Sequence, residues 1–213
     1  MNVIVLFGKP GAGKGTRLSE FLKGKEENFE VLSVSSLLRK EKAEQTEIGK
    51  RAASYMEAGQ LVPDDIINEI VIKGLKAAKK PIFTDGFPRT VAQTEAMLKS
   101  GIIPAMVIEF YVDDDIVVER SKIRIACKKC GETYTTNSFK PPMVEGICDK
   151  CGGTLEKRKD DAEDVVLNRL KVYREETYSC LDVLAKANVP IHTIENSNPE
   201  SASKQFTDLI TSL

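Results

Sequence analysis

The chain has 213 residues, 41% of them apolar, and its acidic and basic side chains nearly balance, giving a net charge of −1. This composition excludes a disordered chain. The balanced charge means that the surface as a whole is not built for nucleic acid or anionic membranes, so any site for a polyanion must come from a local cluster of Arg and Lys. No apolar run approaches membrane-spanning length. We therefore expect one compact domain with inserted pieces, a monomer of the cytoplasm with neither membrane nor nucleic acid as partner. The five cysteines fit that compartment only if they are reduced or bound to metal.

A glycine-rich loop at residues 8–16 follows the apolar run 3–7 and precedes a stretch with helical spacing. A strand, such a loop and a helix form a phosphate cradle, because loop N–H groups and the positive helix end point at one place. Lys14 adds a full charge there. Gly15 stands where Ser or Thr is usual, and Thr16 comes one residue later. The alternative, a flexible glycine-rich turn, is disfavoured by the order of the elements.

The first half of the chain alternates between helical and strand patterns. Strands are expected at residues 29–34, 82–85 and 106–112, and helices end near 23–25 and 98. Ser35 and Ser36 are expected to cap a helix beginning at Leu37, and the polar helical stretch 40–58 is expected to break at Gly49. Further helices are expected to start at caps, which are Asp64 with Asp65, Thr90, and the acidic run 113–115.

The second half contains an interruption at residues 125–163, with four cysteines, several glycines and short β-like runs. A long helix is expected from about 162 to 181, a strand with a packing histidine, His192, at 191–194, and a helix at 199–213. Alternating strands and helices predict an α/β fold: a parallel β-sheet with helices on both faces, like that of the P-loop NTPases.

Asp85 and Arg89 follow the strand expected at 82–85. Ligands of such folds bind beyond the carboxyl ends of the strands, so both should lie beside the phosphate loop. Asp85 is a candidate for the Mg²⁺ shell, because Mg²⁺ needs only one or two carboxylates besides water and phosphate oxygens. The alternative is an Asx turn formed with the following glycine. Arg89 follows a rigid Gly-Phe-Pro, which aims its guanidinium, and a planar guanidinium binds phosphate bidentately.

Several further arginines have a spacing that allows them to converge on the same edge. With Arg89 the set of six is Arg39, Arg89, Arg120, Arg124, Arg158 and Arg169. One nucleotide would not need so many, whereas two phosphorylated ligands meeting head-on would.

Four cysteines form two C-x-x-C pairs, each followed by glycine and separated by the 17 residues 131–147. They are Cys127, Cys130, Cys148 and Cys151. This spacing is typical of four-cysteine structural zinc sites, which have no open catalytic position. Iron would suit the same thiolates, and free thiols or a disulfide pair are the alternatives. Cys180 lies apart on a helix and is expected to be an inert core thiol.

The chain resembles the adenylate kinases of the long, zinc-bearing type, over nearly its whole length. The matching residues are 8–16, 37–39, 59–65, 85–90, Gln93, Arg120, Arg124, 158–161 and Arg169. The resemblance implies reversible Mg²⁺-dependent phosphoryl transfer from ATP to AMP, giving two ADP, and a structural Zn²⁺. It also implies a core of residues 1–33, 63–124 and 164–213, a monophosphate-binding segment at 34–62, and a small zinc-ribbon-like lid at 125–163.

The resemblance also implies residue roles. ATP would be bound by Gly11, Ala12, Gly13, Lys14, Gly15, Thr16, Arg120 and Arg124. AMP would be bound by Ser35, Arg39, Leu61, Val62, Gly86, Arg89, Gln93, Arg158 and Arg169. The catalytic residues around the transferring phosphoryl group would be Lys14, Arg89, Arg124, Arg158 and Arg169. Arg120 would stack on the ATP adenine, and Gln93 would recognise the AMP base.

Three positions depart from the family pattern. Val34 stands where a hydroxyl usually contacts the AMP side, Ile123 replaces a common glycine, and Ile125 replaces an arginine. Altered base preference in a nucleoside monophosphate kinase is therefore one alternative function. A second is a non-catalytic nucleotide-binding protein that uses its zinc ribbon to bind a partner or nucleic acid.

Overall fold

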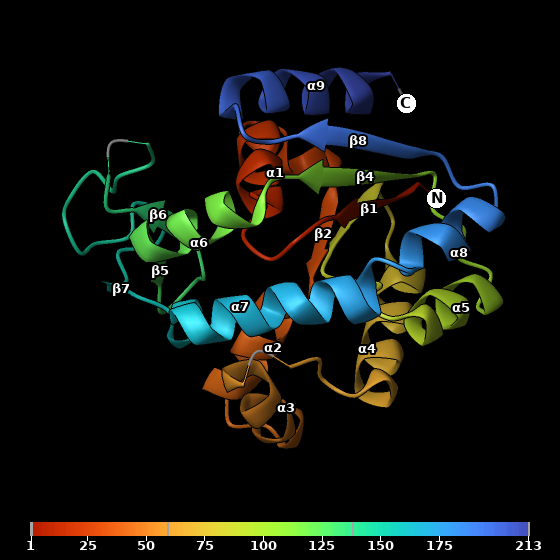
Figure 1. Cartoon of the computed structure of the whole chain (residues 1–213), viewed down its shortest axis with the longest axis horizontal. Helices are drawn as coiled ribbons and strands as arrows, with labels where there is room; N and C mark the ends of the chain where they lie inside the picture. The colour runs from red at the N-terminus through yellow and green to blue at the C-terminus, as the bar shows by residue number, and fades with distance from the viewer. Residues whose placement is uncertain (1, 59, 138, 213) are drawn as a thin grey trace.

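A sheet of five parallel strands, in the order β2-β3-β1-β4-β8, forms the centre of the computed structural model, which describes residues 2–58, 60–137 and 139–212 (Figure 1). The side chain of Lys159 lies outside this description. The strands are β1 Val3–Phe7, β2 Glu30–Ser33, β3 Ile82–Asp85, β4 Met106–Tyr111 and β8 Ile191–Glu195. Leu6 and Ser33 are both in register with Asp85, so the carboxyl ends of three strands meet at one edge.

Helices pack on both faces of this sheet, because alternate side chains of the buried strand β1 point to opposite sides. On one face lie Val3 and Val5, with α4 Asp64–Ala77, α5 Val91–Lys99 and α8 Cys180–Lys186. On the other lie Ile4 and Leu6, with α1 Lys14–Leu22, α6 Asp114–Ile123, α7 Glu163–Val172 and α9 Pro199–Thr211. The predicted α/β fold class is confirmed.

Two helices cross outside the sheet after β2, at the bottom of Figure 1: α2 Val34–Ala43 and α3 Glu47–Glu57. The predicted cap was wrong: α2 begins at Val34, and the Ser33 hydroxyl accepts from the Ser36 N–H at 3.4 Å. The predicted break at Gly49 was also wrong, because Gly49 lies inside α3, and the Thr46 hydroxyl caps that helix by accepting from its N–H.

The ends of the other helices can be compared with the predicted caps. Thr90 caps α5 as predicted, by accepting from the Gln93 N–H. Asp64 and Asp65 do not cap α4 but form its first turn, after Pro63. The C-terminal helix ends at Thr211, and residue 213 lies outside the described residues. A short 3-10 turn, η1 Glu26–Asn28, precedes β2.

The predicted insert forms a separate small sheet at the left of Figure 1, with strands β5 Arg124–Cys127, β6 Thr133–Thr135 and β7 Leu155–Glu156. Its core consists of Cys127, Tyr134, Cys148 and Leu155, which is small for a unit that must hold its shape. A 3-10 turn, η2 Lys159–Asp161, leads back into α7, and the π-helical turn η3 Tyr173–Thr177 joins α7 to α8. Among the described helices, none is long and apolar enough to cross a membrane.

Candidate active site

Glycines allow the backbone of the phosphate loop to pack directly against neighbouring segments of the chain. Gly8 and Gly13 both have positive φ, and a Cβ at either would clash with a neighbour, the Phe110 carbonyl or the Asn196 amide. Only glycine allows this approach. Gly13 caps α1 from the left-handed region, and Gly15 and Thr16 lie in the first turn of that helix. The loop therefore has the shape and helix start of an anion site.

Lys14 points back over this loop. Its Nζ donates to the carbonyl oxygens of Gly8 at 2.7 Å and Lys9 at 3.0 Å. Burial lowers the pKa of Lys14 to about 8; the nearby Asp85 opposes this shift, and three arginines, among them Arg89 and Arg169, add to it. A phosphate group bound in the loop would provide a negatively charged partner for this buried ammonium group.

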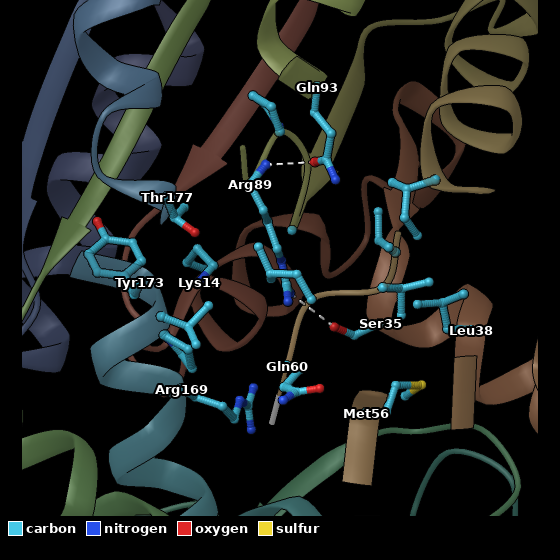
Figure 2. Close-up of a pocket in the computed structure, with 18 of the residues that line it drawn as sticks. Lys14, Ser35, Leu38, Met56, Gln60, Arg89, Gln93, Arg169, Tyr173 and Thr177 are labelled. Atoms are coloured by element: carbon cyan, nitrogen blue, oxygen red, sulfur yellow. Dashed lines mark hydrogen bonds between the residues drawn. The ribbon is translucent and has the colours of Figure 1, made fainter. Parts of the chain in front are cut away.

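Arg89 crosses the middle of the pocket shown in Figure 2. Its backbone N–H donates to Gln93 Oε1 at 2.7 Å, and its Nη2 donates to Ser35 Oγ at 3.3 Å. A Cβ at Gly86 would lie 2.7 Å from Arg89 Nη2, so this glycine leaves room for the guanidinium. Burial lowers the pKa of Arg89, and Asp85 raises it. The contacts with Gln93 and Ser35 thus hold Arg89 in the middle of the pocket.

Gln93 is 2% exposed, and Asp64 orients it. Gln93 Nε2 donates to Asp64 Oδ1 at 2.7 Å, while Thr90 Oγ1 donates to Asp64 Oδ2 at 2.8 Å. A carboxamide has two N–H groups and two acceptor sites, so one of each stays available to a ligand. The orienting role of Asp64 was missed, because the sequence suggested a helix cap there.

Apolar side chains line the far side of the same pocket. They are Val34, Leu38, Met56, Leu61, Val62 and Ile67, and Leu38 and Met56 are labelled in Figure 2. Val34 is 5% exposed, so the departure from the family pattern sits in the pocket wall. Thr177 and Tyr173, from the π-helical turn, line the opposite side, and sequence reasoning missed both. π-Helical turns are frequent at functional sites but give no clear sequence signal.

Two aspartates of η2 hold arginines from three parts of the chain. Asp160 Oδ2 lies 3.2 Å from Arg39 Nη2 and 3.1 Å from Arg169 Nη1. Asp161 accepts from Arg124 Nε at 2.8 Å and also from Arg124 Nη2. Neither aspartate was predicted to act in the site, although both belong to the matching segment 158–161.

Arginines outnumber carboxylates around η2, and this excess of positive charge shifts the pKa values of the neighbouring groups. Burial raises the pKa of Asp160, but Arg169, Arg39 and other arginines outweigh it and hold the pKa below its ordinary value. Burial and neighbouring cations lower the pKa of Arg158 to about 9 and, against the opposing effect of Asp160, that of Arg169 to about 10. Arg158 Nε is buried with no hydrogen-bond partner among the described residues. Anionic ligand oxygens would satisfy this cluster.

Arg120 lies beside the phosphate loop, with its Nη1 3.7 Å from where a Cβ at Gly13 would be, and its Nη2 donates to the Asn196 carbonyl at 2.6 Å. Arg17 is 3% exposed and donates to the Pro199 carbonyl at 2.5 Å and to Ser203 Oγ at 2.6 Å. Burial lowers the pKa of Arg120, and the charge of Arg17 adds to this effect. Sequence reasoning missed Arg17 and Asn196, since neither belongs to a motif.

Asp85 lies at the carboxyl end of β3, close enough to Lys14 to raise its pKa. Among the described residues, its carboxylate has no hydrogen-bond or ion-pair partner. Its nearer oxygen would be 3.9 Å from a Cβ placed at Gly15. A free carboxylate beside the phosphate loop suits a hydrated Mg²⁺.

The four cysteines of the C-x-x-C pairs come together in the small sheet, with their sulfurs all within 4.8 Å of one another. Cys127 Sγ is 3.4 Å from Cys151 Sγ, and Cys130 Sγ is 3.6 Å from Cys148 Sγ. Tetrahedral zinc with Zn–S of about 2.3 Å requires sulfurs about 3.8 Å apart, so the residues fit this metal. The predicted clustering is confirmed.

The four-cysteine cluster lies against Tyr134, which is 4% exposed. The Tyr134 hydroxyl is 3.4 Å from Cys148 Sγ and accepts from the Asp149 N–H at 2.9 Å. Burial raises the pKa of Cys148, but the Tyr134 hydroxyl and backbone N–H groups outweigh it and lower the pKa to about 6. Thiolate is the form that binds metal. Cys180 is fully buried near α5, in agreement with an inert core thiol.

Known proteins match the chain along its length. The family model described as adenylate kinase matches residues 6–189. Curated adenylate kinases of Thermosipho melanesiensis and Clostridioides difficile are each 38% identical to it, with 99% of the chain covered and 99% and 97% of the relatives. The adenylate kinase of Methanothrix thermoacetophila is 40% identical, over 97% of the chain and 95% of the relative. On these matches, and with a parallel sheet, a phosphate loop and a four-cysteine lid, the chain belongs to the adenylate kinase family.

Proposed function

We propose that the chain transfers the terminal phosphoryl group of ATP to AMP, in a reversible reaction that yields two ADP. The observation that carries this proposal is a pocket where cations from three segments exceed the nearby carboxylates. The cations are Lys14, Arg39, Arg89, Arg124, Arg158 and Arg169, and the carboxylates are Asp85, Asp160 and Asp161. This excess suits two phosphorylated ligands that meet in the cleft.

The donor, ATP, binds along the phosphate loop. The N–H groups of residues 11–16 and the start of α1 hold its phosphates, and Lys14 turns from the loop carbonyls to the terminal phosphates. Arg120 packs against the adenine beside the loop.

The acceptor, AMP, binds in the pocket of Figure 2. Arg39 and Arg89 hold its phosphate, and the base lies against the apolar wall that includes Leu61 and Val62. Gln93, oriented by Asp64, offers the base one N–H and one acceptor. A carboxamide pairs with adenine in this way.

The reaction is an in-line displacement. An oxygen of the AMP phosphate attacks the γ-phosphorus, a P–O bond forms, and the bond to the bridging oxygen breaks, so that ADP leaves with its electron pair. The second pKa of a phosphate monoester is about 6, so the attacking oxygen carries no proton at neutral pH and no general base is needed. Lys14, Arg124, Arg158 and Arg169 neutralise the transferring oxygens.

Two ions complete the proposal. Mg²⁺ bound with ATP would lie beside the free Asp85 carboxylate and would neutralise phosphate charge. Zn²⁺ held by the four cysteines would cross-link the lid, whose apolar core is small.

Two segments, 34–62 and 125–163, close over the nucleotides. This division is supported by the contact of Arg39 with Asp160, which joins the two segments. A second contact ties segment 34–62 to α7 of the core, where Asn168 Nδ2 donates to the Ala58 carbonyl at 2.9 Å. Closure excludes water, which would otherwise compete with AMP as the acceptor.

The test is a coupled assay with ATP, Mg²⁺ and each of AMP, GMP, CMP and UMP. The proposal predicts ADP formation with AMP at a kcat/KM at least tenfold above the other acceptors. A preference for another monophosphate would identify a kinase of altered base choice, for which Val34 in the pocket wall is the candidate cause. No turnover with any acceptor would overturn the proposed activity.

A further inference from the structure

Asn196, in the connection between β8 and α9, contacts three parts of the donor side at once. Its Nδ2 donates to the Ala12 carbonyl at 2.6 Å. Its backbone N–H donates to the Tyr111 carbonyl at 2.8 Å, and its own carbonyl accepts from Arg120 Nη2 at 2.6 Å. The residue is 1% exposed, so no water replaces these bonds easily. The buried residue Asn196 therefore joins the phosphate loop, the end of β4 and Arg120.

The bond to Ala12 fixes the direction of one peptide group in the loop. In a trans peptide, the carbonyl of one residue and the N–H of the next point in opposite directions. Because Asn196 holds the Ala12 carbonyl on its own side, the Gly13 N–H points the other way, away from Asn196. An anion cradle needs its N–H groups turned to the ligand and its carbonyls turned away. Asn196 imposes that arrangement on the Ala12–Gly13 peptide.

Close packing makes the contact specific. A Cβ at Gly13 would clash with Asn196 Nδ2, so the loop backbone and the amide are in direct contact. The same hypothetical atom would lie 3.7 Å from Arg120 Nη1, which is buried and has no hydrogen-bond partner among the described residues. The free N–H group of Arg120 thus lies near the peptide that Asn196 orients.

We propose that Asn196 is a positioning residue for the donor nucleotide. It sets the Gly13 N–H toward the phosphates and fixes Arg120, which under the proposed function packs on the base. The inference rests on that function for the identity of the ligand. It goes beyond the site residues implied by the sequence motifs, because Asn196 belongs to none of them.

The test compares two substitutions with a matched control on the same connection. Asn196→Ala removes the donor to Ala12, and Asn196→Asp keeps the shape but places a carboxylate oxygen against the Ala12 carbonyl. The control is Asn198→Ala, because Asn198 is exposed and its side chain caps α9, accepting from the N–H groups of Glu200 and Ser201 at 3.1 Å. Binding of Mg²⁺ with the β,γ-imido analogue of ATP, and separately of AMP, is measured by calorimetric titration.

We expect N196A to weaken binding of the ATP analogue about tenfold, as the loss of one buried hydrogen bond does. N196D should weaken it further, while AMP binding stays within twofold in both variants and N198A binds both ligands like the parent. The inference is overturned if the folded variants bind the analogue within twofold of the parent, or if binding of the analogue and of AMP falls by the same factor. Isosteric N196D carries the test should N196A fail to fold.

These titrations need no turnover. A parent protein that binds the ATP analogue but does not phosphorylate AMP would disprove the proposed function and leave the role of Asn196 testable.

Discussion

Arg39 of α2 and Asp160 of η2 form an ion pair, with 3.2 Å between Arg39 Nη2 and Asp160 Oδ2. Asp160 also holds Arg169 at 3.1 Å, so one carboxylate joins the segment 34–62 to the lid and to α7. Under the proposed function these arginines bind phosphate. Asp160 therefore supplies part of the negative charge that nucleotides would bring to these arginines, and its two ion pairs tie α2 to η2 and α7.

The substitution Asp160→Asn should open the ligand-free protein. Without the carboxylate, Arg39 and Arg169 lose their partner and repel each other across the cleft. We expect a larger radius of gyration by small-angle X-ray scattering, and a return to the parent value with Mg²⁺, the ATP analogue and AMP. The control is Glu156→Gln, which breaks only a pair within the lid, with Lys128 at 3.0 Å. An unchanged radius in ligand-free D160N would contradict this role of Asp160.

The substitution Arg89→Ala should lower kcat by about a thousandfold, the scale of arginines that neutralise a transferring phosphoryl group. Arg89 lies in the cleft and belongs to neither hydrophobic core cluster, so the midpoint of thermal unfolding should move by a few degrees at most. Arg89→Lys should recover little, because a single ammonium cannot replace a bidentate fork. Arg51→Ala is the control, since Arg51 is exposed on α3 and lies 3.8 Å from its partner Asp65. A twofold effect of R89A would refute the assigned role.

Binding of ATP should weaken as the pH rises above about 8. Burial lowers the pKa of Lys14 to about 8 in the free protein, and bound phosphates raise it again. Below pH 8 the Lys14 side chain is already protonated, so binding of ATP takes up no proton. Above pH 8 the neutral amine must take up a proton when ATP binds. We expect the Kd of the ATP analogue to rise up to tenfold per pH unit above 8, measured by titration between pH 6.5 and 9.5. Lys14→Arg keeps its charge over this range, so a slope that persists in K14R would rule out Lys14 as its source.

Loss of metal should loosen the lid rather than the central sheet. The lid core has only Cys127, Tyr134, Cys148 and Leu155, whereas two large clusters cover the central sheet. We expect about one equivalent of zinc per chain by elemental analysis, and less than a tenth of that in Cys148→Ser. Limited proteolysis of C148S should then cut within residues 125–163. Cys180→Ala serves as control and should retain its metal, since Cys180 lies apart from the cluster. Less than half an equivalent in the parent would argue against the zinc site.

The features of the protein that depend on local pattern could be predicted from the amino-acid sequence. A buried apolar run before a glycine-rich loop predicted a strand that enters a phosphate cradle, and the spacing of the two C-x-x-C pairs predicted that four sulfurs come together; the structure has both. Local pattern was weaker at helix ends, where several residues can serve as the cap. Ser33 took the place predicted for Ser35 and Ser36, because its extended backbone lets the hydroxyl reach the Ser36 N–H.

Which distant side chains support the site could be seen in the folded structure alone. Asp64 orients Gln93 across 29 positions of the chain, and Asn196 reaches Ala12 across 184. Arg17 is buried on α1, although its charge would place it in solvent, because the carbonyl of Pro199 receives its guanidinium. Such contacts have no period or spacing in the sequence. They arise because the parallel sheet brings separate strand ends and their connections to one edge, where buried polar groups must find partners.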